Sequence, residues 1–118
     1  MKINHDNLIG VFIILLFSEI TSPSDTYIEA GVATSLVCGV TGNDGTPSYV
    51  WYETGESTAV FTDTNNDATS TYNIGSPSES DTGSYYCVVT MTVDTVENGG
   101  FDSSEANLYV RGTNYLQY

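Results

Sequence analysis

Side chains that commonly carry out catalysis are scarce in this 118-residue chain. It contains two cysteines, Cys38 and Cys87, one histidine, His5, and two basic side chains, Lys2 and Arg111. A hydrolytic triad needs a general base such as His, and a Schiff base needs Lys, but the only His and the only Lys stand close to the N-terminus. The two thiols are therefore the main reactive groups, as a disulfide, as free thiols or as metal ligands. An enzyme is not expected.

The N-terminus has the pattern of a secretory signal peptide. A polar stretch with Lys2 precedes an almost unbroken apolar run over residues 8–17. That run is shorter than the roughly 20 apolar residues that a membrane span needs, so a membrane anchor is the less favoured alternative. We expect cleavage between Ile20 and Ser24, which gives a leader over residues 1–22, and we expect no membrane span elsewhere in the chain.

Secretion would place both cysteines in an oxidising compartment, where disulfides form and persist. With only two cysteines, the one possible intramolecular bridge joins Cys38 to Cys87. Loop-closure entropy predicts about 4 kcal/mol of stabilisation from a loop of this size. A metal-bound pair is the alternative, but zinc would lack further ligands because no His remains after cleavage.

The chain is strongly acidic, with a formal net charge of −13. Removing the leader, which carries Lys2, Asp6 and Glu19, leaves a charge of about −12 with Arg111 as the only basic side chain. Nucleic acid, heparin and anionic lipid surfaces all require clusters of Lys and Arg, so none of them is an expected partner. A neutral or basic protein surface is compatible with this charge. The alternative is that the charge only keeps the domain soluble.

Alternation of apolar and polar residues predicts an all-β domain with frequent turns. One strand over residues 34–40 and another over residues 48–52 are expected, followed by a short strand over residues 57–62. The residues predicted to point inward from these and the following strand are Leu36, Cys38, Tyr49, Trp51, Tyr72 and Ile74.

The spacing of the cysteines and of a single tryptophan resembles the immunoglobulin superfamily. Cys38 and Cys87 flank Trp51, and the second cysteine ends the run Asp81-Thr-Gly83-Ser-Tyr85-Tyr86-Cys87. The resemblance extends from about Gly31 to Val110. It implies a two-sheet Greek-key sandwich over residues 23–112, with the disulfide between the sheets, and residues 113–118 as a C-terminal tail.

The resemblance also implies roles for the signature residues Trp51, Asp81, Gly83 and Tyr85. Trp51 would pack on the disulfide, and the Tyr85 hydroxyl would bond to backbone upstream as a tyrosine corner. Many family members pair the aspartate with a basic residue, but no Lys or Arg stands between Ile3 and Val110. We therefore expect Asp81 to accept backbone N–H bonds in the turn before its strand. The short stretch between Trp51 and Tyr72 indicates an intermediate or truncated variable-like domain.

Asn98-Gly99 is a strong signal for a type I′ hairpin turn. Folding about this turn pairs residues whose numbers sum to 197, so that Cys87 would face Val110 and Val89 would face Leu108. Every predicted core position of one strand would then meet an apolar residue of the other.

This register predicts an outer sheet face rich in Tyr and Val, which give large contact areas at recognition sites. The alternative is that these residues are simply good strand formers on a solvated face. The predicted binding residues are Val50, Tyr52, Tyr86, Val88, Tyr109, Val96, Asn98, Gly99 and Phe101.

A metal site and a cofactor are not expected. Asp63-Thr-Asn65-Asn-Asp67 resembles the opening of an EF-hand loop, but Ala68 and Ile74 stand at the sixth and twelfth positions, where Gly and Glu belong. The alternative is a calcium site in this loop or among Asp94, Glu97, Asp102 and Glu105, but solvated carboxylates are favoured in both places.

The function that the sequence favours is an extracellular protein-binding module of cell-surface or secreted recognition or adhesion. Its partner would be a protein ligand or a second copy of the chain, with no small-molecule substrate. The alternative is a structural spacer domain of a longer receptor ectodomain.

Overall fold

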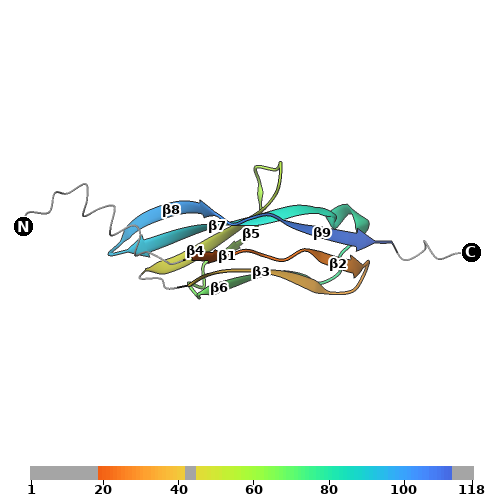
Figure 1. The fold of residues 1–118 in the computed structure, drawn as a ribbon, viewed down its shortest axis with the longest axis horizontal. Helices are drawn as coiled ribbons and strands as arrows, with labels where there is room; N and C mark the ends of the chain where they lie inside the picture. The colour runs from red at the N-terminus through yellow and green to blue at the C-terminus, as the bar shows by residue number, and fades with distance from the viewer. Residues whose placement is uncertain (1–18, 42–44, 113–118) are drawn as a thin grey trace, which may run out of the picture.

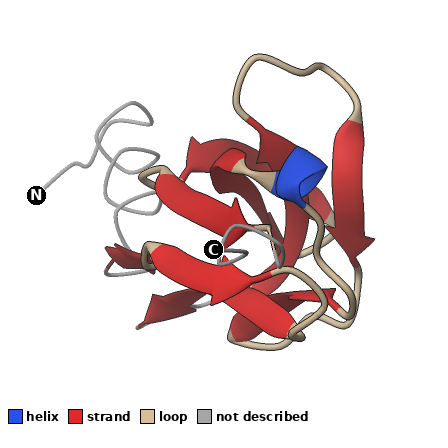
Figure 2. Ribbon diagram, turned by 90° about the vertical axis from the view of Figure 1, so that its right-hand side faces the viewer, coloured by secondary structure: helices blue, strands red, loops and turns tan. Residues whose placement is uncertain are grey.

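The computed structural model describes residues 19–41 and 45–112, which form two β-sheets packed face to face (Figure 1). The strands within these ranges are β1 (Glu19–Thr21), β2 (Thr26–Glu29), β3 (Thr34–Thr41), β4 (Thr46–Glu53), β5 (Ala59–Asp63), β6 (Thr69–Ile74), β7 (Gly83–Val93), β8 (Val96–Asp102) and β9 (Ala106–Arg111). One 3-10 turn, η1 (Glu79–Asp81), precedes β7 and is blue in the end-on view of Figure 2. The predicted all-β, two-sheet fold is confirmed.

The smaller sheet has the strand order β1-β3-β6, and the larger has the order β2-β9-β7-β4-β5 with β8 also paired to β7. All pairs are antiparallel except β2 with β9, which run parallel. No helix within the two described ranges is long and apolar enough to cross a membrane.

Both sheets contribute alternate residues to one hydrophobic core, as the period-two pattern predicts. The disulfide between Cys38 of β3 and Cys87 of β7 joins the two sheets, which confirms the predicted bridge. Trp51 is fully buried beside them, and its indole N–H donates to the Ser70 hydroxyl at 2.9 Å. The other core residues are Leu36, Val40, Tyr49, Ile74, Tyr85, Val89, Met91, Leu108 and Val110.

The turn that leads into β7 is held by the two signature residues predicted for it. The Tyr85 hydroxyl donates to the Asp81 carbonyl, as a tyrosine corner requires. The Asp81 carboxylate accepts the backbone N–H of Ser78 at 2.8 Å, in place of a basic partner. Both predictions are confirmed.

The last residues of the predicted leader form part of the sandwich. β1 pairs with β3, Ile20 lies opposite Val40, and its side chain packs against the core. The Ser22 hydroxyl then accepts the backbone N–H of Ser104 at 2.9 Å. Cleavage between Ile20 and Ser24 would therefore cut through β1 or detach it. Residues 1–18 of the predicted leader and the tail over residues 113–118 lie outside the described residues.

The prediction of a hairpin turn at Asn98-Gly99 is wrong. Strands β7 and β8 are joined by Asp94 and Thr95, with φ angles of 49° and 66°, and Val93 faces Val96 across this two-residue turn. Positive φ at both central positions is what a type I′ turn requires. Asn98-Gly99 lies inside β8.

The register that followed from that turn is also wrong. Val89 faces Phe101 rather than Leu108, and Leu108 of β9 faces Gly83 instead. The physical reason is the turn at Asp94 and Thr95, which pairs β7 with β8 instead of with β9 at Val89. A bulge at Val89 and Thr90, where Gly99 brings the two backbones together, shifts the pairing by one further residue. A Cβ on Gly99 would lie 2.8 Å from the Thr90 Cα, so this close approach requires glycine.

Candidate protein-binding face

Four predicted binding residues come together on the outer side of the larger sheet. Val50 of β4 faces Val88 of β7, and Tyr52 faces Tyr86. All four are partly exposed, and the Tyr52 and Tyr86 rings stack with centroids 5.7 Å apart and an interplanar angle of 24°. We call Val50, Tyr52, Tyr86 and Val88 the tyrosine patch.

The patch is positioned by the residues that alternate with it. Tyr49, Trp51, Cys87 and Val89 each have a relative exposure of 0%. Because successive strand residues point to opposite faces, burying these four residues directs their neighbours outward. The patch therefore stands on two strands whose inner side forms the centre of the core.

Tyr109 does not join the tyrosine patch, contrary to the prediction. It is exposed on β9, but β9 pairs with β7 only over Gly83–Tyr85, so Tyr109 lies beyond the start of β7. Its ring neighbour is Tyr27 of β2, with centroids 6.3 Å apart.

Most of the predicted binding residues of β8 lie on the inner side of the hairpin, because the predicted register was wrong. Phe101 faces Val89 and packs against the core, and Asn98 faces buried Met91. Val96 faces Val93 next to the turn and is exposed there. Gly99 faces Thr90, and its contribution is backbone geometry rather than a contact surface.

The outer side of β8 instead carries carboxylates that the predicted register did not place beside the patch. Asp102 lies opposite Val88 of the patch, Glu97 lies opposite Thr92, and both acidic side chains are exposed. In an antiparallel pair, directly opposed residues share one face of the sheet. The correct register was the only signal that would have placed these acids beside the patch.

The inner tyrosines have a structural role that is distinct from the patch. Burial, together with the nearby Asp63 and Asp67 carboxylates, raises the pKa of Tyr49 to about 12, and its hydroxyl donates to the Asp67 carbonyl at 2.8 Å. Burial is also the main cause that raises the pKa of Tyr85. These phenols stay neutral at ordinary pH and hold loops against the core.

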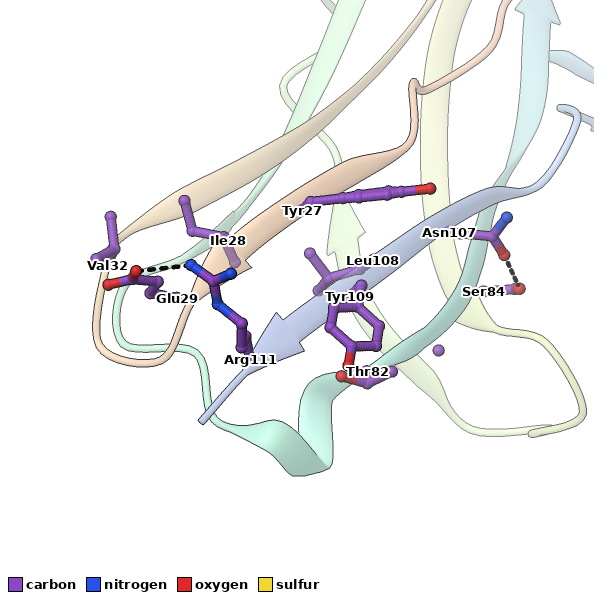
Figure 3. A pocket seen from close by; sticks show the side chains of 11 residues that line it. Tyr27, Ile28, Glu29, Val32, Thr82, Ser84, Asn107, Leu108, Tyr109 and Arg111 are labelled. Carbon is purple, nitrogen blue, oxygen red and sulfur yellow. Dashed lines mark hydrogen bonds and ion pairs between the residues drawn. The ribbon is translucent and has the colours of Figure 1, made fainter. Parts of the chain in front are cut away.

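A groove of about 940 Å³ lies over β2, β9 and the start of β7 (Figure 3). Tyr27, Leu108 and Tyr109 line it, and at its end Arg111 forms an ion pair with Glu29 at 2.8 Å. The groove depends on the parallel pairing of β2 with β9. Strand alternation carries no information about which strands pair, so the sequence reasoning did not find it.

The acidic loop that resembles an EF-hand opening uses its first aspartate to shape the chain. Asp63 is buried and accepts the backbone N–H of Asn65 at 3.0 Å. Among the residues that the structure describes, no three His, Cys, Asp or Glu side chains gather closely enough to hold a metal ion.

Comparison with known proteins agrees with the fold. An immunoglobulin-domain family model matches residues 18–90. No curated protein matches the sequence. Among solved structures, the M1 domain from titin has a TM-score of 0.56 at 21% identity, and the match covers 78% of this chain and 94% of that one.

Two complexes of immunoglobulin domains are also similar to the chain. Dpr1 IG1, solved bound to DIP-eta IG1, has a TM-score of 0.55 at 19% identity over 78% of this chain and 95% of that one. The complex of titin M10 with obscurin-like 1 has a TM-score of 0.56 at 17% identity over 80% and 95%. At these identities the structural matches show the fold alone. Since the family model covers more than half of the sequence, the chain belongs to the immunoglobulin-domain family.

Proposed function

We propose that this chain is an extracellular protein-binding module that acts in recognition or adhesion through the tyrosine patch. The observation that carries the proposal is the stacked pair Tyr52 and Tyr86, flanked by Val50 and Val88 on the outer side of the sheet. Tyrosine supplies a large contact area at a low cost in conformational entropy, which favours it at recognition surfaces.

A protein surface suits the patch better than a small molecule does. Small-molecule sites are concave, and none of the four patch residues lines the groove of Figure 3. The similar structures Dpr1 IG1 with DIP-eta IG1 and titin M10 with obscurin-like 1 are complexes between proteins, which supports the same use of this fold here.

The extracellular part of the proposal is supported by the disulfide and by the leader pattern. Disulfides form and persist in oxidising compartments, and Cys38 is bonded to Cys87 across the sheets. The apolar run over residues 8–17 is typical of a secretory signal.

The absence of catalysis is part of the same proposal. The tyrosines whose pKa is raised, Tyr49, Tyr72 and Tyr85, are held in or against the core. The tyrosine patch consists of two phenols and two valines, so it contains no Ser, Thr, Cys, Lys, His, Asp or Glu.

The experiment compares Tyr86→Glu with the matched variant Tyr109→Glu. Both positions are outward-facing tyrosines of the same sheet, but only Tyr86 belongs to the tyrosine patch. The oxidised chain, displayed as a tetramer, would be tested for binding to an array of extracellular protein domains, and each variant's melting temperature would be measured.

We expect Tyr86→Glu to weaken binding to the recovered partner by at least about tenfold, which is typical of a central aromatic contact. Tyr109→Glu should bind within about twofold of the parent, and both variants should melt as the parent does, because neither side chain is in the core. A partner whose binding is unaffected by Tyr86→Glu would contradict the proposal. Binding to no array member would favour the spacer role.

A further inference from the structure

The tyrosine patch has an acidic edge on the side of the long hairpin formed by β7 and β8. Asp102 is directly opposite Val88, and Glu97 is opposite Thr92 on the same face of the sheet. Asp94 adds a third exposed carboxylate at the hairpin turn. Anything that covers the patch and extends along this hairpin therefore meets carboxylates.

Within residues 19–41 and 45–112, no basic side chain lies beside these carboxylates. The only Lys and Arg of the chain are Lys2 and Arg111. Arg111 lies on β9 at the other end of the sheet and pairs with Glu29 at 2.8 Å. The patch is thus an apolar centre with acid along one edge and with no basic side chain of the described residues beside it.

This arrangement is unfavourable for contact with a second copy through the patch. A two-fold dimer places the same surface patch of both subunits in one interface, so the carboxylates of both copies would be brought together. Juxtaposed like charges cost several kcal/mol at an interface. The net charge of −13 on each whole chain adds repulsion at longer range.

We propose that the tyrosine patch, together with Glu97 and Asp102, docks a different protein whose contact surface is apolar at its centre and carries Lys or Arg at its rim. This inference rests on the proposed function and adds the chemistry of the partner. Tyr52 and Tyr86 provide the salt-independent contact, and the carboxylates provide attraction that weakens as salt screens it.

The test uses two synthetic peptides that differ only in charge. One alternates Lys with Tyr or Val, in the order Lys-Tyr-Lys-Val-Lys-Tyr-Lys, and the other has Glu in place of each Lys. Each would be titrated into the isotopically labelled, oxidised chain, and NMR shift changes would give both the dissociation constant and the residues contacted. Titrations would be run at about 20 mM and about 500 mM salt, where the screening length differs several-fold.

We expect the Lys peptide to shift Tyr52, Tyr86 and Val88, and to bind at least about tenfold more tightly than the Glu peptide at low salt. The ratio of the two peptides' dissociation constants should fall to within about twofold at high salt. The double variant Glu97→Lys with Asp102→Lys should reverse the preference while leaving the melting temperature unchanged, since both side chains are exposed.

Equal binding of the two peptides at the patch would overturn the inference and leave the proposed function standing. Binding of the Lys peptide to another surface, with the patch residues unshifted, would overturn the inference and remove support from the proposed function. Sedimentation equilibrium supplies a separate test with the chain alone. A dimer at low salt that is lost in Tyr86→Glu would overturn the inference in favour of a second copy, again leaving the patch as a protein-binding face.

Discussion

The inner and outer sides of β4 and β7 differ sharply although they are made of the same strands. On the inner side, Trp51 and Cys87 have a relative exposure of 0% and belong to the core. On the outer side, their immediate neighbours Tyr52 and Tyr86 are partly exposed and stack on each other. A shift of one residue along the strand thus changes a side chain from a core element to a surface element.

We therefore expect stability and binding to be separable in the domain. The inner residues are expected to affect the free energy of unfolding, and the outer residues are expected to affect binding with little effect on unfolding.

The largest effect is expected from Trp51→Ala, with Tyr52→Ala as its matched neighbour. The substitution Trp51→Ala removes a buried ring whose centroid lies 6.0 Å from that of Tyr72. It also removes the indole N–H that the Ser70 hydroxyl accepts. The free energy of unfolding should fall by about 3 to 5 kcal/mol in Trp51→Ala and by about 1 kcal/mol in Tyr52→Ala. Urea unfolding measures both values. Equal losses of unfolding free energy in the two variants would contradict the distinction between the inner and outer sides of β4.

The second-largest loss of unfolding free energy is expected from removal of the disulfide. Replacing Cys38 and Cys87 with Ala removes the covalent link between the sheets and should cost about 2 to 5 kcal/mol. Unfolding of the double variant would be compared with that of the oxidised parent. An unchanged denaturation midpoint would show that the disulfide does not stabilise the domain.

Alkaline pH should destabilise the domain through the inner tyrosines. In the folded state the pKa of Tyr49 is raised to about 12, whereas an unfolded phenol ionises near pH 10. The stabilisation is complete below pH 10 and is lost as pH rises from 10 to 12, because the unfolded state then releases a proton that the folded state retains. The expected loss from Tyr49 is about 2 to 3 kcal/mol at pH 12.

Urea unfolding at pH 9, 11 and 12 would test this pH dependence. Tyr49→Phe should lose less stability than the parent across the same interval, because it has no phenol to ionise at that position. Equal stability of the parent at pH 9 and pH 12 would contradict the assignment of Tyr49 to the buried side.

The smallest of these effects concerns β1, where the same alternation spans three residues. Ile20 packs against the core, whereas Glu19 and Thr21 are exposed. A chain that begins at Pro23 should be less stable than one that begins at Glu19 by about 1 to 2 kcal/mol, the contribution of one partly buried Ile. Thermal unfolding of the two chains measures the difference. Identical curves would show that β1 adds nothing to the sandwich.

Short-range patterns were sufficient to predict the body of the sandwich. The spacing of Cys38, Trp51 and Cys87 identifies the family, and alternation correctly places Leu36 and Tyr49 inside. The inward positions are predictable because alternation depends only on neighbouring residues in one strand, whose faces alternate with a period of two. The spacing of the cysteines and the tryptophan is informative because it matches a known family pattern.

The hairpin and the site depended on longer-range information. Asn98-Gly99 has the stronger turn propensity, yet the turn forms at Asp94 and Thr95, where a β-branched residue takes positive φ. The packing of Phe101 against the core accompanies this register. Since the register decides which side chains of β8 face outward, the acidic edge of the patch was not predictable from local propensity.

The most direct test of the account is a paired alanine scan along β7. Tyr85 and Val89 represent the inner side, and Tyr86 and Val88 represent the outer side. For each variant, the free energy of unfolding and the affinity for the Lys peptide would be measured. We predict losses of about 2 to 5 kcal/mol in unfolding for the inner variants. The outer variants should lose under about 1 kcal/mol in unfolding and bind the peptide more weakly by about tenfold. Outer variants that bind as the parent does, or that unfold as easily as the inner ones, would contradict the separation of the two sides.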